Sequence, residues 1–164
     1  MDPRAYLEQH VKTREEIDNF LKFDYTDAYD AKGLGWTYNA ELGWILVDSI
    51  RPDGIDGSKT FYHYEPTGAR RCINSADQIA RVHTYGNSFT HCDQVSDGET
   101  WQEYLAAHLR EPIENYGVGG YSVYQAYRRM RKIEETHHDN YIVLNIWEYD
   151  NLRNIDAWRT LRLS

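Results

Sequence analysis

Three short segments of the chain carry residue types that acyl-transfer chemistry uses. They are Gly86-Asn87-Ser88, the stretch from Asn115 to Ser122, and the stretch from Trp147 to Asn151. A serine hydroxyl is a weak nucleophile that needs an exposed position and a base. Backbone N–H groups and side-chain donors nearby can stabilise an oxyanion. Ser88, which follows a glycine hinge, is therefore a candidate nucleophile, and the other interpretation of Ser88 is a helix N-cap.

Each segment directly follows a stretch that is predicted to form a strand. The expected strands and the helices between them are 81–85, 100–109, 112–118, 122–135 and 141–147. This alternation predicts a parallel sheet, whose ligands bind beyond the carboxyl ends of the strands. The last strand is continuously apolar, which predicts that both of its faces are covered. The second helix opens with a capping box at Ser122 and Gln125, and Tyr124, Tyr127 and Met130 are predicted to form its buried stripe.

In order and spacing, the three segments resemble the motifs of the SGNH (GDSL-like) hydrolase family, over about residues 36–154. The resemblance implies an α/β fold with a flavodoxin-like three-layer parallel sheet, preceded by an amino-terminal helical and β-rich extension. It implies a serine esterase that hydrolyses or transfers a small acyl group on a carbohydrate or lipid ester. No metal and no organic cofactor is implied.

The resemblance also implies roles for individual residues. These are the catalytic Ser88, the oxyanion-hole residues Ser88, Gly120, Tyr149 and Asn151, and the bracing residues Asn87 and Asp150. The third segment departs from the family pattern, because Trp147 stands where the family has Gly and Tyr149 where it has Asn. A phenol O–H and an amide N–H can both donate to an oxyanion, so Tyr149 and Asn151 remain alternatives.

The general base of the family, a histidine in an Asp-x-x-His motif, is absent from these 164 residues. His83 and His137 are expected far from Ser88. His91 lies near Ser88, but no carboxylate at a recognisable spacing orients it as a triad requires. We therefore expect an amino-terminal part of a longer hydrolase, and the alternative is a catalytically inactive flavodoxin-like binding module. An unfinished sheet exposes an edge, which predicts a homo-oligomer.

Composition limits the remaining function classes. The chain has 18 Lys and Arg against 26 Asp and Glu, a net charge of −8, which argues against a nucleic-acid partner. No apolar run reaches the length of a membrane span, and no apolar leader opens the chain, so the cytoplasm is the default location.

The expected partner is a small ester such as an acylated carbohydrate, against which Trp147 and Tyr121 could stack. The expected parts are a helical lead-in, 1–33; a β- and turn-rich extension, 34–80; and a partial SGNH-type α/β core, 81–164.

Overall fold

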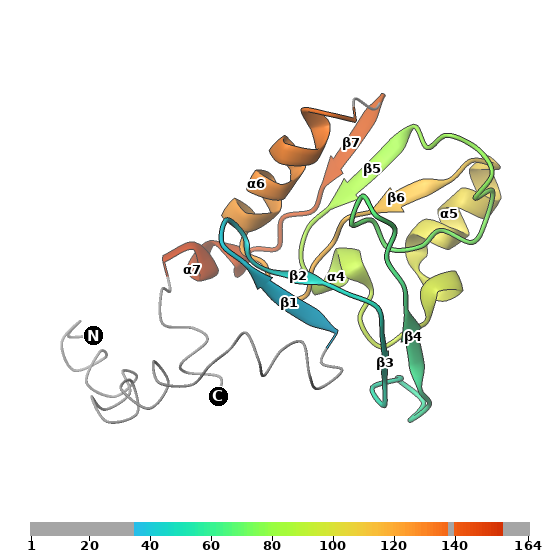
Figure 1. The fold of residues 1–164 in the computed structure, drawn as a ribbon, viewed down its shortest axis with the longest axis horizontal. Helices are drawn as coiled ribbons and strands as arrows, with labels where there is room; N and C mark the ends of the chain where they lie inside the picture. The colour runs from blue at the N-terminus through green and yellow to red at the C-terminus, as the bar shows by residue number, and fades with distance from the viewer. Residues whose placement is uncertain (1–34, 138–139, 156–164) are drawn as a thin grey trace.

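The computed structural model describes residues 35–137 and 140–155, so the predicted helical lead-in lies outside the described residues (Figure 1). Two antiparallel hairpins precede a mixed α/β region. The elements in chain order are β1 (Trp36–Asn39), β2 (Gly43–Leu46), β3 (Ser49–Arg51), β4 (Thr60–Tyr62), β5 (Val82–Tyr85), α4 (Ser88–His91), a 3₁₀ turn (Asp97–Glu99), α5 (Trp101–Leu109), β6 (Ile113–Asn115), α6 (Val123–Glu134), β7 (Tyr141–Leu144) and α7 (Asp150–Ile155).

The three strands of the α/β region form a parallel sheet in the order β6-β5-β7, which confirms the predicted α/β class and its parallel sheet. Val82 of β5 pairs with Ile113 on one side and with Tyr141 on the other. The predicted strand 112–118 stops at Asn115, because the side chain of Asn115 accepts the N–H of Gly117 at 3.0 Å and turns the chain. A complete flavodoxin-like three-layer sheet stays a prediction.

Helices α5 and α6 pack against β5 through alternate side chains of that strand. Val82 shares an apolar cluster with Ala106 of α5, and Thr84 accepts a hydrogen bond from Gln102 of the same helix at 3.1 Å. Tyr85 packs instead near α6 and donates to Glu134 at 2.6 Å. Because successive strand residues point to opposite faces, the central strand is covered on both sides.

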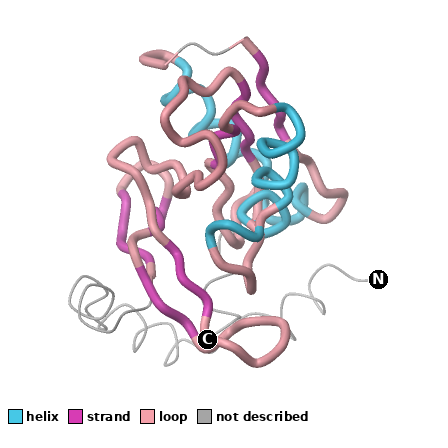
Figure 2. The backbone as a smooth tube through the Cα atoms, turned by 90° about the vertical axis from the view of Figure 1, so that its right-hand side faces the viewer, coloured by secondary structure: helices cyan, strands magenta, loops and turns pink. Residues whose placement is uncertain are grey.

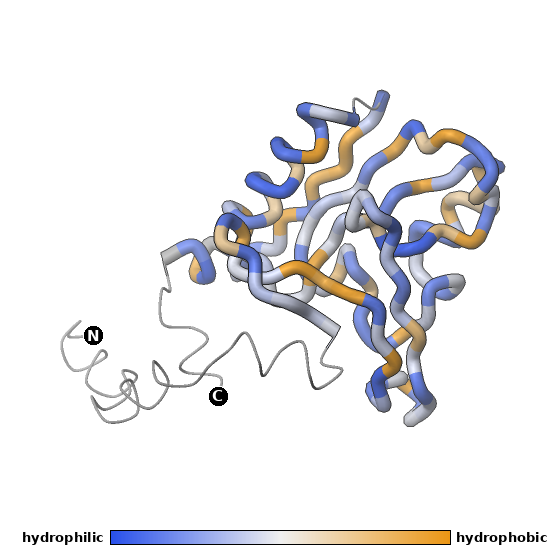
Figure 3. The backbone as a smooth tube through the Cα atoms, in the orientation of Figure 1, coloured by the Kyte–Doolittle hydropathy of each residue, from blue (hydrophilic) through white to orange (hydrophobic). Residues whose placement is uncertain are grey.

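The predicted buried stripe of α6 is only partly correct: Met130 packs against the cluster of Tyr85 and Tyr116, but the two tyrosines predicted with it do not. Ser122 caps the helix as expected, but Tyr124 and Tyr127 are exposed, whereas Ala126 and Arg129 are buried. Ala126 joins a cluster with Leu42 from the β1–β2 turn, so this hairpin determines which side of the helix is covered. Figure 3 accordingly shows hydrophilic residues along much of α6.

Strand β7 lies at the edge of the sheet, and the prediction that both of its faces are covered is wrong. Tyr141, Ile142 and Val143 are all exposed. Within the described part of the chain, β7 pairs only with β5. The apolar run that suggested a buried strand therefore forms an open edge, and self-association through it stays a prediction.

The β-rich extension shares its core with the α/β region. One pair of hairpin strands lies to one side of the helices in Figure 2. Leu42 packs with Val118 and Tyr121, and Ala69 packs with Tyr85 and Tyr116. The predicted boundaries 34–80 and 81–164 stay predictions, but apolar clusters cross the division between them. No helix in the described ranges is both long and apolar enough to span a bilayer.

Candidate active site

Backbone hydrogen bonds bring the segments after the three parallel strands together. The N–H of Val118 donates to the carbonyl of Gly86 at 3.0 Å, and the N–H of Asn145 donates to the carbonyl of Tyr85 at 2.8 Å. The chain after β5 therefore lies between the chain after β6 and the chain after β7. This is the edge at which open α/β sheets bind their ligands.

Ser88 is the first residue of α4 and is half-buried. The N-cap is Asn87, whose side-chain oxygen accepts the N–H of Phe89 at 2.9 Å, so the N-cap interpretation of Ser88 is wrong. Gly86 permits the sharp entry into this helix. A Cβ there would lie 3.0 Å from the Cβ of Asn145 and against the side chain of Thr90.

The glycine loop after β6 packs directly on the end of α4. A Cβ on Gly117 would lie 2.7 Å from the carbonyl carbon of Thr90, and one on Gly119 would lie 2.9 Å from a carboxylate oxygen of Asp93. Gly120 has φ +82°, a left-handed conformation that favours glycine. Trp44 of β2 covers this turn, since its ring would lie 3.3 Å from a Cβ on Gly120.

Asp150 joins the third segment to the first. Its carboxylate is buried and accepts the side-chain amide of Asn87 at 2.8 Å and the N–H of Trp147 at 3.2 Å. Arg153 lies 2.9 Å from its other oxygen, as an ion pair rather than an aligned hydrogen bond. Arg153 also donates to the carbonyl of Tyr121 at 3.1 Å, so one guanidinium links the second and third segments.

Sequence reasoning missed Arg153. Its signal is the spacing of three residues from Asp150, which places both side chains on one side of a helix. The spacing is informative only if a helix is predicted over these residues, and the sequence predicts no helix after the third strand.

An aromatic cluster lies beside Ser88. The rings of Phe89 and Trp147 are 5.6 Å apart, and those of Trp147 and Tyr149 are 4.8 Å apart. Phe89 and Tyr149 are exposed. Tyr121, by contrast, is fully buried and donates to the carbonyl of Trp44 at 2.5 Å, so it cannot stack against a ligand as predicted. The side chain of Asn151 lies outside the described part of the structure.

His91 differs from its prediction, because a carboxylate does orient it. Its Nδ1 contacts Asp93, and its Nε2 lies 2.7 Å from the hydroxyl of Tyr64. Burial lowers the pKa of His91, against the opposing effect of Asp93. The imidazole is therefore neutral at pH 7, and both of its nitrogens are already engaged. In this arrangement His91 is not available as a base for Ser88.

The other described histidines that form hydrogen bonds contact groups away from Ser88. His63 pairs with Asp97 at 2.6 Å, and His137 contacts Thr136 at 2.8 Å. His83 lies 3.0 Å from Glu114 and 2.7 Å from Glu134. Within residues 35–137 and 140–155, no group of three or more His, Cys, Asp or Glu side chains could hold a metal ion.

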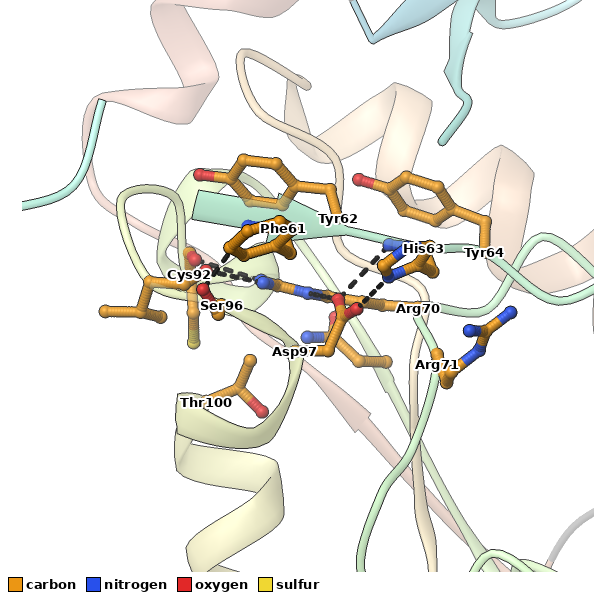
Figure 4. A network of polar contacts seen from close by, with 12 residues as sticks. Phe61, Tyr62, His63, Tyr64, Arg70, Arg71, Cys92, Ser96, Asp97 and Thr100 are labelled. Atoms are coloured by element: carbon orange, nitrogen blue, oxygen red, sulfur yellow. Dashed lines mark hydrogen bonds and ion pairs between the residues drawn. The ribbon is translucent and has the colours of Figure 1, made fainter. Parts of the chain in front are cut away.

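A buried arginine from the extension holds the chain that follows α4 (Figure 4). Arg70 donates to the carbonyls of His91 at 2.6 Å, Cys92 at 3.0 Å and Val95 at 2.5 Å. It also pairs with buried Asp97 at 3.0 Å. The carbonyls at the end of α4 lack hydrogen-bond donors within the helix, and the guanidinium of Arg70 donates to them instead. The extension therefore fixes the position of the helix that begins with Ser88.

Replacing Asn87 tests the bond between the first and third segments. We expect Asn87→Ala to lower the free energy of unfolding by about 3 kcal/mol, because both the cap and a hydrogen bond to a buried carboxylate are lost. Asn87→Ser keeps the capping oxygen and should lose about 1 kcal/mol less. Urea unfolding followed by tryptophan fluorescence measures both changes. Wild-type stability in Asn87→Ala would contradict the described link to Asp150.

Comparison with known proteins gives few matches. No protein-family model and no curated protein sequence matches the chain. Two solved structures are similar to it, with a TM-score of 0.40 in each case. One is AlinE4, an SGNH-hydrolase family esterase, with 22% identity over 47% of this chain and 45% of that chain. The other is a point mutant of the esterase AlinE4, with 23% identity over 46% of this chain and 44% of that chain. The matched region is thus less than half of either esterase, and a similarity of this degree carries no conclusion about activity.

Proposed function

We propose that this chain carries the nucleophile region of an SGNH-type serine esterase, with Ser88 as the nucleophile. The observation that carries the proposal is the hydrogen bond between Asn87 and Asp150, which joins strand ends 63 residues apart. Gly117 packs tightly on α4, which brings the second segment next to the helix that begins with Ser88. The three segments that the sequence singled out therefore meet at one edge of the sheet.

The proposed oxyanion hole comprises the N–H groups of Ser88 and Gly120 and a donor from the third segment. Ser88 opens a helix, and N–H groups in a first helical turn lack intrahelical acceptors. Gly120 lies in a left-handed turn of the glycine loop that follows β6 and is the second proposed backbone donor. Tyr149 is exposed next to Trp147 and is the favoured side-chain donor, and Asn151 is the alternative.

The proposed substrate is a small ester, with an acylated carbohydrate as the favoured class. The exposed cluster of Phe89, Trp147 and Tyr149 supplies flat apolar surface beside the nucleophile. Such surfaces stack on the apolar face of a sugar ring, while hydroxyl groups at their edges donate hydrogen bonds. The same cluster on a protein without a base would serve the alternative function, a binding module.

The proposed base comes from outside these 164 residues, as an Asp-x-x-His histidine of a longer chain or of a partner chain. Ser88 has no imidazole partner among the described residues, because the buried histidine closest in sequence, His91, is engaged by Asp93 and Tyr64. A triad needs the base within hydrogen-bond reach of the serine oxygen.

Labelling with a fluorophosphonate tests the proposal on the product of the complete open reading frame. We expect a covalent adduct on the peptide containing Ser88, detected by mass spectrometry and lost in Ser88→Ala. Ser96→Ala is the matched control and should keep the adduct. For the 164-residue chain alone, turnover of p-nitrophenyl acetate should be marginal and unchanged by Ser88→Ala. A full-length product without an adduct would exclude the esterase and favour the binding module.

A further inference from the structure

A half-enclosed cavity of about 520 Å³ lies away from Ser88, between the β1–β2 hairpin and the second half of α6. None of its lining residues belongs to the three segments around Ser88. Its lining residues include Leu42, Leu46, Gly68, Arg129, Lys132 and Ile133. A cavity of this size with mostly apolar walls and a few polar groups has the properties of a small-molecule site.

Arg129 places a positive charge at the wall of this cavity. Its side chain is buried, and Nη2 donates to the carbonyl of Gly68 at 2.8 Å. The ring of Tyr116 lies 5.7 Å from the guanidinium carbon, and Tyr121 is a further hydrogen-bond contact. The buried Nε has no hydrogen-bond partner, and no carboxylate among the described residues forms an ion pair with Arg129. A buried charge is costly unless it is paired, so this guanidinium calls for an anion.

Arg70, which is also buried, has a guanidinium whose charge is balanced by a carboxylate. Arg70 pairs with buried Asp97, and its three nitrogen atoms all donate to oxygen. Arg129 is also buried, but among the described residues it has neither a carboxylate partner nor a hydrogen-bond partner for Nε. Because Arg129 lines a cavity, an anion bound in that cavity would supply the negative charge that Asp97 supplies to Arg70.

The charges around the cavity favour an anion over a cation. Lys132 lines it and shares the exposed carboxylate of Glu41 with Arg128. Glu135 is the carboxylate in the lining, and it is exposed and 3.7 Å from Arg131. This end of α6 thus concentrates cations in a chain whose net charge is −8.

We propose that the cavity binds a small organic anion, a carboxylate attached to an apolar body. The carboxylate would pair with the guanidinium of Arg129, which lines the cavity, because guanidinium groups pair well with carboxylates. The apolar body would lie against Leu42, Leu46 and Ile133. This proposal does not depend on esterase activity, because it uses none of the residues around Ser88.

Thermal unfolding and calorimetry of the protein with octanoate test the site. We expect one binding site and a rise in Tm of about 5 °C near saturation. Acetate lacks the apolar body and octylamine carries the opposite charge, so neither should raise Tm. Arg129→Gln should abolish the octanoate effect, whereas the matched control Arg128→Gln should keep it.

A second variant covers the case in which Arg129→Gln fails to fold. Ile133→Trp fills the cavity and leaves the guanidinium in place, so it should also abolish the octanoate shift. No rise in Tm with octanoate on the wild-type protein would overturn the proposal. An equal rise with octylamine, or unchanged octanoate binding in a folded Arg129→Gln or Ile133→Trp protein, would overturn it as well.

Discussion

Arg70→Met is expected to lower the free energy of unfolding by about 3–5 kcal/mol. The substitution leaves Asp97 buried without its guanidinium and leaves the carbonyls of His91, Cys92 and Val95 without their donor. A methionine side chain has similar length and fills the space, so the loss reports on charge and hydrogen bonding rather than on a void. Chemical denaturation followed by tryptophan fluorescence measures it.

The neighbouring arginine provides the matched control. Arg71 is half-exposed and pairs with half-exposed Glu65 at 3.2 Å, and such surface pairs contribute about 0–1 kcal/mol. Arg71→Met should therefore unfold close to the wild-type midpoint. Equal losses in Arg70→Met and Arg71→Met would show that the buried network in Figure 4 does not hold the chain after α4.

His83→Leu is the second substitution with a large expected effect, about 3 kcal/mol at pH 7. Both ring nitrogens of His83 face carboxylates, Glu114 at 3.0 Å and Glu134 at 2.7 Å, and the side chain is buried. Leucine leaves these two carboxylates facing each other without the imidazole. The hydroxyls of Tyr116 and Tyr85 still donate to them, which limits the loss.

The loss in His83→Leu should shrink as the pH falls. Burial raises the pKa of Glu114, but hydrogen bonds from His83 and Tyr116 and the charge of His137 outweigh it, so the pKa lies below its ordinary value. In the wild-type protein this carboxylate therefore contributes stability above the ordinary pKa of about 4.5, which is lost as the pH falls through the lower folded value. In the variant the carboxylates become easier to protonate, so acid relieves their repulsion.

Chemical denaturation of the wild-type protein and of His83→Leu between pH 7 and pH 4 measures how the difference in their free energies of unfolding decreases. Exposed His108→Leu is the control and should follow the wild-type protein at every pH. A difference between His83→Leu and the wild-type protein that stays constant over this range would show that packing, and not the carboxylates, determines the effect of His83.

The parallel sheet could be predicted because its signals are local. The strand before Gly86 and the helix opening at Ser122 each depend on a short pattern, and the structure has both. The exposed edge at β7 could not be predicted, because an apolar strand has the same composition whether or not a neighbour covers it. The buried side of α6 depends on Leu42, which lies more than 80 residues earlier.

The partners of His91 illustrate why the site could be predicted only in part. Asp93 is two residues away, but a spacing of two has no fixed geometry outside a strand, so its contact with His91 depends on how α4 ends. Tyr64 comes from the extension, and no short-range pattern connects it to His91. The segments that follow strands could be identified because strand ends meet in any parallel sheet. Arg70 and Trp44 could not, since they approach from outside that sheet.

The position of Arg70 in the chain has a consequence for folding during synthesis. The four residues that accept hydrogen bonds from its guanidinium, from His91 to Asp97, leave the ribosome 21 to 27 residues after it. These hydrogen bonds therefore form only after the chain beyond α4 has emerged, and burial of the guanidinium then coincides with ordering of that segment. Chains tend to form local structure as it is made. The extension is thus synthesised before the segment that Arg70 holds, but its buried contacts are completed only together with later parts of the chain.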